Sequence, residues 1–168
     1  QVVKEVLTER TAAFELFPGP YTIAHQRLEA LLASLGTPAT TRLPIYLADT
    51  LASPESGTLP MSGFGVVGQE IVEERLRADF VKTSDDILVI VGNPPYERMS
   101  SKTPWDPFAT ALLQHVVNAT PLDRRRDLKS ASDLFVAFWA WALWALLPPQ
   151  TRAASAQSPH MDTRHNNG

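Results

Sequence analysis

The chain has 168 residues, of which 44% are hydrophobic and 20% charged, and it carries a formal net charge of −3 and no cysteine. This composition is typical of a globular domain and excludes a wholly disordered chain, a coiled coil and a collagen-like repeat. The absence of cysteine excludes a disulfide scaffold, a zinc–thiolate site and a cysteine nucleophile. The acidic balance gives no whole-chain support for non-specific DNA binding.

The N-terminal part of the sequence alternates helical and strand patterns. Residues 1–11 carry valines and a leucine at helical spacing and indicate the end of a helix, and residues 11–17 (TAAFELF) are short and apolar, as in a buried strand. A helix is predicted to begin at Pro20 and to end at Gly36, because proline suits the first turn and glycine the position after the last. Residues 43–47 (LPIYL) are a second strand candidate.

The later elements continue this alternation. Residues 52–65 are rich in Pro, Ser and Gly and indicate a loop, and residues 66–82 are amphipathic, as in a helix. Residues 87–91 (ILVIV) are the clearest strand candidate, because a continuous β-branched run is expected of a parallel strand covered on both faces. Helices are predicted over 108–119 and 133–147. The alternation as a whole predicts an α/β fold with a mainly parallel sheet.

The most apolar stretch lies near the end of the chain, at 134–147 (LFVAFWAWALWALL). It has 14 residues, whereas a membrane-spanning helix needs about 20, so we expect a helix packed on all sides and no membrane partner. The N-terminus lacks the basic region and apolar run of a secretory signal, and we expect a cytoplasmic location. Residues 148–168 are polar and aperiodic and cannot offset their ordering entropy, which predicts a disordered or frame-shifted tail.

A candidate site follows the third predicted strand, at Gly92-Asn93-Pro94-Pro95-Tyr96. Ligands of open α/β sheets bind outside the carboxyl ends of the strands. Two consecutive prolines fix an extended backbone and remove two N–H donors, so carbonyl and amide acceptors converge beside an aromatic ring. Such a site suits a planar group that carries an NH₂, such as the exocyclic amine of a base or a side-chain amide. For Asn-Pro-Pro alone, a plain turn is the alternative.

The segment VIVGNPPY, at 89–96, resembles the catalytic motif of amino-methyltransferases that use S-adenosylmethionine, above all the adenine-N6 DNA methyltransferases. The tetrapeptide is shared with other amino-methyltransferases, but an ordered set of blocks over 1–147 is more specific. It resembles the large bacterial restriction–modification polypeptides that join a helicase to an adenine methyltransferase. These blocks are FELFPGPYTIAHQRLEALLASLG, LPIYLADTL, ILVIVGNPPYER and DLFVAFWAWALW. The resemblance implies a Rossmann-like methyltransferase fold over 1–147.

On the donor side, the resemblance implies two contacts to S-adenosylmethionine. Glu15 matches the acid that binds the ribose hydroxyls, and a carboxylate can accept hydrogen bonds from both hydroxyls of a diol. Asp49 matches the residue beside the donor's adenine, where a carboxylate can accept from the NH₂ group. The alternatives are a solvated acid at a strand end for Glu15 and a turn cap for Asp49.

On the target side, the resemblance implies double-stranded DNA with a flipped adenine as the partner. Asn93 matches the residue whose side-chain oxygen accepts from adenine N6, the carbonyl of Pro94 is the second acceptor, and Pro95 completes the motif. Tyr96 would stack on the base that leaves the duplex, at a cost of a few kcal/mol, or simply pack on the loop. The step implied is direct displacement of the methyl group by N6, helped by in-line positioning, with no metal and no covalent enzyme intermediate.

Parts of such a methyltransferase are missing from the sequence. We find no glycine-rich loop after an earlier strand, where the methionine part of the donor sits. In the family, that strand lies between the strands that carry Glu15 and Asn93. Further strands of the family's domain come after the position that corresponds to residue 147. We therefore expect an incomplete domain that needs the rest of a parent polypeptide. A non-catalytic truncated remnant, or an amino-methyltransferase acting on protein glutamine or RNA, are the alternatives.

Overall fold

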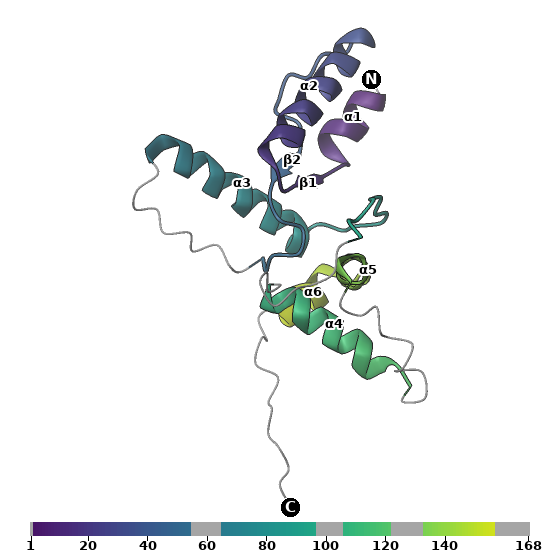
Figure 1. Ribbon diagram of the computed structural model, residues 1–168. Helices are drawn as coiled ribbons and strands as arrows, with labels where there is room; N and C mark the ends of the chain where they lie inside the picture. Colours follow the sequence, from purple (N-terminus) through teal and green to yellow (C-terminus); the bar gives the residue numbers. More distant parts are fainter. Residues whose placement is uncertain (1, 55–64, 97–105, 122–132, 157–168) are drawn as a thin grey trace, which may run out of the picture. The chain divides into compact units, whose positions relative to one another are not determined.

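The computed structural model describes residues 2–54, 65–96, 106–121 and 133–156 (Figure 1). Its elements in chain order are α1 (Val2–Glu9), β1 (Ala13–Glu15), α2 (Pro18–Ser34), β2 (Ile45–Leu47), α3 (Gly65–Ser84), α4 (Pro107–Ala119), α5 (Leu134–Ala145) and α6 (Pro149–Ala156). The chain divides into an N-terminal unit, Gln1–Thr50 with Ser56–Val81, and a C-terminal unit, Leu51–Glu55 with Lys82–Gly168. Most of the loop predicted over 52–65 lies outside the described residues.

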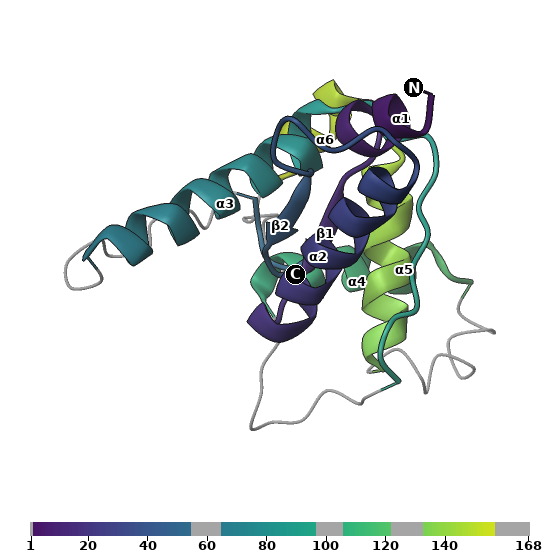
Figure 2. The same cartoon turned by 90° about the horizontal axis from the view of Figure 1, so that it is seen from above.

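The N-terminal unit is built on a parallel strand pair with a helical crossover. β1 and β2 pair in parallel, with Phe14 opposite Tyr46. α2 connects the two strands and packs against both (Figure 2). Its core centres on Leu32, Leu43 and Ile45, which are at most 3% exposed. The strands predicted over 11–17 and 43–47 are confirmed and pair in parallel, and the larger Rossmann-like fold remains a prediction.

The ends of α2 follow from local sequence. Pro18 and Pro20 occupy its first turn, where a missing N–H costs nothing. At its other end Gly36 adopts φ +68°. The N–H of Gly36 donates to the carbonyl of Ala33 at 3.0 Å, and the N–H of Thr37 donates to that of Leu32 at 2.9 Å. These paired bonds form a Schellman motif, which satisfies carbonyls that the helix leaves open.

The C-terminal unit is centred on the packing of α4 against α5. The ring of Phe108 meets that of Trp144 edge-on, with centroids 4.9 Å apart. The apolar helix predicted over 133–147 is confirmed, but it is not packed on all sides. Trp139 is 64% exposed and Leu143 is 59% exposed. In the described part of the chain, no helix combines the length and the apolar character needed to cross a membrane.

The third predicted strand is absent. Residues 87–91 have no regular secondary structure, and the sheet of the described residues has the two strands β1 and β2. Leu88, Val89 and Val91 are 88%, 77% and 92% exposed. A strand exists only where a neighbour completes its hydrogen-bond ladder, and the described residues supply none for this segment. The apolar, β-branched composition remains, without the pairing that it suits.

The segment after α5 is helical where the sequence predicted a tail from 148. Arg152 of α6 is fully buried, and its guanidinium donates to the carbonyl of Lys82 at 2.8 Å and to that of Asp85. The indole N–H of Trp144 donates to the hydroxyl of Ser155 at 2.8 Å. These bonds to residues outside α6 hold a helix that local composition does not predict. Residues 157–168 of the predicted tail lie outside the described residues.

Candidate functional site

The two residues expected to bind the methyl donor lie at one edge of the strand pair. Glu15 ends β1, and Asp49 comes two residues after the end of β2. Because β1 and β2 are parallel, their carboxyl ends meet at the same edge. The N–H of Ala48 donates to the carbonyl of Glu15 at 3.0 Å. The chain that leads into Asp49 is therefore bonded directly to the backbone of Glu15.

The carboxylate of Glu15 is held at the start of α2. Its Oε1 accepts from the N–H of Phe17 at 3.0 Å, and Phe17 is the N-cap residue of α2. A negative charge is stabilised there, because the amide dipoles of a helix point their positive ends at its N-terminus. Glu15 is half-buried and Asp49 is exposed. Both side chains are thus accessible to a ligand at the sheet edge.

The predicted catalytic tetrapeptide belongs to the C-terminal unit. Asn93 and Pro95 are exposed and Pro94 is half-buried. Tyr96 is 81% exposed, and its ring centroid lies 6.1 Å from that of Phe135. Contrary to the sequence prediction, no strand precedes this segment. Most of the tyrosine ring is available to stack on a planar group.

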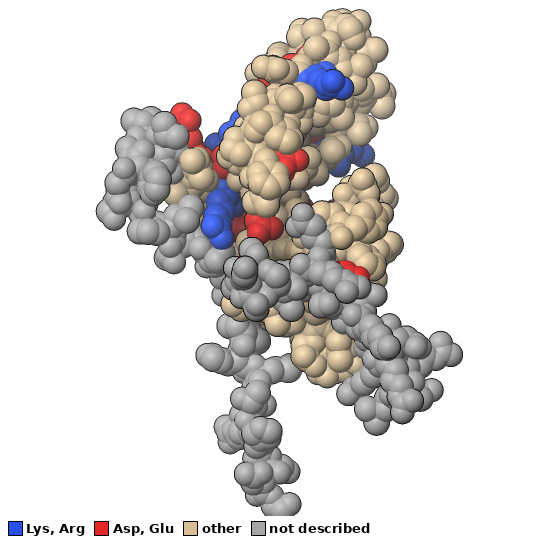
Figure 3. Space-filling model, viewed as in Figure 1, with Lys and Arg blue, Asp and Glu red and all other residues tan. Residues whose placement is uncertain are grey.

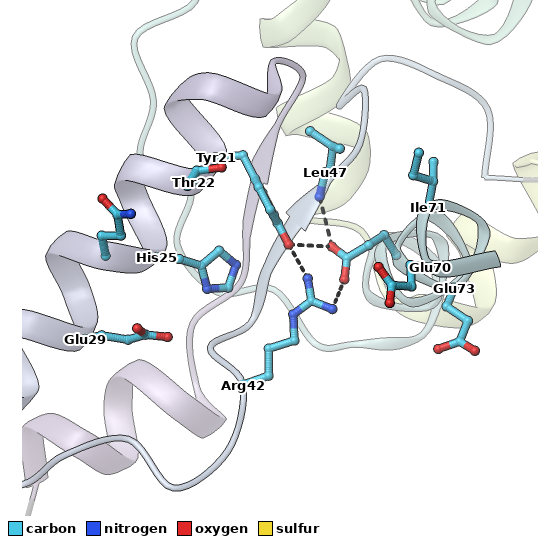
Figure 4. A pocket seen from close by; sticks show the side chains of 11 residues that line it. Tyr21, Thr22, His25, Glu29, Arg42, Leu47, Glu70, Ile71 and Glu73 are labelled. Atoms are coloured by element: carbon cyan, nitrogen blue, oxygen red, sulfur yellow. Dashed lines mark hydrogen bonds and ion pairs between the residues drawn. The ribbon is translucent and has the colours of Figure 1, made fainter. Parts of the chain in front are cut away.

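A cavity of about 630 Å³ opens beside the strand pair, between α2, β2 and α3 (Figure 4). None of the predicted site residues lines it. Its wall is acidic on one side, with Glu70 and Glu73 from α3, and aromatic on the other, with Tyr21 and His25 from α2. The cavity is therefore a separate feature from the sheet edge, and no pattern in the sequence predicted it.

A buried carboxylate at the wall of this cavity links the elements around it. The side chain of Glu74 is 6% exposed. Its Oε2 accepts from the N–H of Leu47 at 3.1 Å and from the hydroxyl of Tyr21 at 3.4 Å. The guanidinium of Arg42 forms an ion pair with Glu74 and donates to the hydroxyl of Tyr21. Dashed lines in Figure 4 trace these contacts.

This arrangement shifts the ionisation of Tyr21. Burial raises the pKa of the phenol above its ordinary value of 10.0, and the negative charge of Glu74 raises it further. The positive charge of Arg42 acts in the opposite direction. No pattern in the sequence indicates this cluster, because Glu74 lies on α3 beside exposed acids such as Glu73, which is 67% exposed.

The described surface carries its charges in small groups. On the face seen in Figure 3, blue and red side chains lie among uncharged surface and form no broad basic area within the described ranges. Some basic groups are already neutralised by neighbouring acids, in the ion pairs Arg10–Glu5 and Arg77–Glu73. Sequence-independent DNA affinity needs clustered Lys and Arg, and the described part of this face does not supply them.

The two carboxylates at the sheet edge suit a ligand that carries hydroxyl and amino groups. Two carboxylates that project from adjacent strand ends can accept hydrogen bonds from a diol and from an NH₂ group. Among the described residues, no three His, Cys, Asp or Glu side chains are grouped to hold a metal ion. Comparisons of the chain with protein families, with curated proteins and with solved structures find no match.

Proposed function

We propose that this chain is part of an S-adenosylmethionine-dependent DNA adenine-N6 methyltransferase that belongs to a bacterial restriction–modification enzyme. The observation that carries the proposal is the parallel pairing of β1 with β2, with Glu15 and Asp49 at the same sheet edge. The resemblance of VIVGNPPY and of the ordered blocks around it supports the same activity.

The residues at the sheet edge fit the donor. Glu15 keeps Oε2 free of any hydrogen bond to a described residue, while Oε1 is anchored by Phe17. A carboxylate fixed in this way can accept from both ribose hydroxyls. The exposed carboxylate of Asp49 can accept from the amino group of the donor's adenine. When bound there, S-adenosylmethionine would supply the methyl group.

The motif in the C-terminal unit would hold the target base. The side-chain oxygen of Asn93 and the carbonyl of Pro94 would both accept from the N6 amino group. Two acceptors on one NH₂ group hold the nitrogen and direct its lone pair away from the loop, toward the methyl group. The exposed ring of Tyr96 would stack on the flipped adenine, offsetting part of the cost of unstacking.

A second candidate is a non-catalytic remnant of such an enzyme. The exposure of Leu88, Val89 and Val91 favours it. An apolar segment with the composition of a buried strand is exposed to solvent beside the candidate catalytic loop. A loop without the support of a strand holds Asn93 in no fixed geometry. The remnant would bind neither donor nor DNA well.

Methyl transfer separates the candidates. The polypeptide that contains this chain is incubated with S-adenosylmethionine labelled on the methyl group and with one of three substrates: adenine-containing duplex DNA, RNA or a glutamine peptide. We expect label on N6 of adenine in DNA and loss of transfer in Asn93→Ala. Asn118→Ala, an exposed asparagine of α4, is the matched control. Label on RNA or glutamine would change the substrate class, and no label on any substrate supports the remnant.

A further inference from the structure

Glu74 differs from the acids around it in its burial and in its partners. Its side chain is 6% exposed, whereas that of Glu73 on the same helix is 67% exposed. Its carboxylate contacts α2 through Tyr21, the loop before β2 through Arg42, and β2 itself through Leu47. A buried carboxylate with this many partners is held in one place, and it holds its partners in turn.

The contact with Leu47 lies at the critical end of β2. Leu47 donates its N–H to Glu74 Oε2 at 3.1 Å, and the next residue, Ala48, donates its N–H to the carbonyl of Glu15 at 3.0 Å. Successive N–H groups of a strand point to opposite sides, so this end of β2 is fixed from both sides. Asp49 follows immediately. The position of Asp49 relative to Glu15 therefore depends on both bonds.

We propose that Glu74 is a positioning residue for binding of the methyl donor. Glu74 fixes the end of β2, from which Asp49 reaches the adenine of the donor. The inference rests on the proposed function, since it assigns Asp49 to the donor. Arg42 and Tyr21 hold the carboxylate of Glu74 toward β2. Glu74 itself does not touch the donor and acts through the main chain of Leu47 and Asp49.

The test is a double-mutant cycle on ligand affinity. Binding of S-adenosylhomocysteine is measured by calorimetry for the wild type, Glu74→Gln, Asp49→Ala and the double variant. Loss of one well-placed hydrogen bond weakens binding roughly fivefold, and we expect this in Glu74→Gln. If Glu74 acts through Asp49, the double variant binds no more weakly than Asp49→Ala alone. Glu73→Gln, which removes the same charge from the neighbouring exposed position, leaves affinity unchanged.

A ligand comparison separates positioning from a general loss of structure. An analogue of S-adenosylhomocysteine with a hydrogen in place of the 6-amino group of adenine has no N–H at that edge of the base, so Asp49 cannot accept a hydrogen bond from it. We expect Glu74→Gln to bind this analogue as the wild type does. Amide exchange at Leu47 should be faster in Glu74→Gln than in Glu73→Gln. If Glu74→Gln does not fold, Tyr21→Phe removes a partner of Glu74 and should show a smaller loss with the same ligand dependence.

The outcomes distinguish this inference from the proposed function. Additive losses in the cycle, or equal losses for the two ligands, overturn the positioning role of Glu74 and leave the donor site standing. Failure of the wild type to bind S-adenosylhomocysteine overturns the proposed donor site and this inference together.

Discussion

Tyr21 reports on the buried cluster at the scale of a single residue. Burial and the charge of Glu74 raise the pKa of its phenol. Because the folded chain favours the protonated phenol, this contribution to stability is fully present below pH 10.0, the ordinary pKa, and is lost as the pH rises from there through the folded value. The contribution of Tyr21 to stability therefore depends on pH only in the alkaline range.

Absorbance titration of the phenols checks this. The chain has 3 tyrosines, and we expect Tyr21 to ionise at higher pH than an ordinary phenol in the folded protein. Tyr21→Phe should remove that late component, and unfolding in denaturant should remove the shift. Absence of a late component from the wild type would show that the cluster around Glu74 is not formed, and a late component that persists in Tyr21→Phe would belong to another tyrosine.

The site residues show how far sequence reasoning reaches at this scale. Glu15 and Asp49 were assigned to the site by the resemblance to amino-methyltransferases, and parallel pairing brings them to one edge. Glu74 was missed because the charged residues near it on the same helix, Glu70, Glu73 and Arg77, are exposed. By sequence alone, Glu74 looks like one more exposed charge of this helix. Burial by a distant tyrosine and arginine leaves no mark on the local sequence.

At the level of single elements, the two glycines at the ends of α2, Gly19 and Gly36, should respond differently to substitution by alanine in the free energy of unfolding. Gly36→Ala places a side chain at φ +68° and should lower the free energy of unfolding by about 1 kcal/mol. Gly19 lies inside the first turn of α2, where alanine fits the helix better, so Gly19→Ala should be neutral or stabilising. An added Cβ meets no atom within 4 Å at either site, so conformation alone decides. Thermal unfolding of both variants measures this, and equal shifts would contradict it.

Arg152 gives a second prediction, for α6. Arg152→Ala leaves the carbonyls of Lys82 and Asp85 without this donor and should cost about 2–3 kcal/mol of unfolding free energy. Arg10→Ala, which removes an exposed arginine paired with Glu5, should cost less than about 1 kcal/mol. Urea denaturation compares them. Equal costs would mean that α6 is not held by Arg152.

The predictability of each element depends on whether its determinants are local. The C-terminal end of α2 could be predicted because Gly36 acts within one turn, whereas the helix begins at Pro18, two residues before the predicted Pro20. α6 could not, since the partners of Arg152 lie 67 and 70 residues away in sequence. The segment 87–91 was predicted wrongly as a strand, because its composition fits a sheet but pairing requires a second strand.

At the scale of the whole molecule, the exposed segment 87–91 predicts self-association. Unpaired backbone groups beside exposed Leu88, Val89 and Val91 offer a template for strand pairing with another chain. Sedimentation should show a mass that rises with concentration, and Val89→Lys should reduce it. Gln114→Lys adds the same charge at an exposed polar position of α4 and should leave association unchanged. A monomer at all concentrations would contradict the prediction.

Binding of S-adenosylmethionine should depend on the two carboxylates at the edge of the strand pair. The polypeptide that contains this chain is titrated with S-adenosylmethionine in a calorimeter, together with its Glu15→Ala variant and with Glu9→Ala as a control at an exposed acid of α1. We expect saturable binding by the wild type and by Glu9→Ala, and affinity lower by at least about tenfold in Glu15→Ala, because a charged acceptor for the ribose is lost. Absence of heat from the wild type at millimolar donor, or equal affinity in all three proteins, would contradict it.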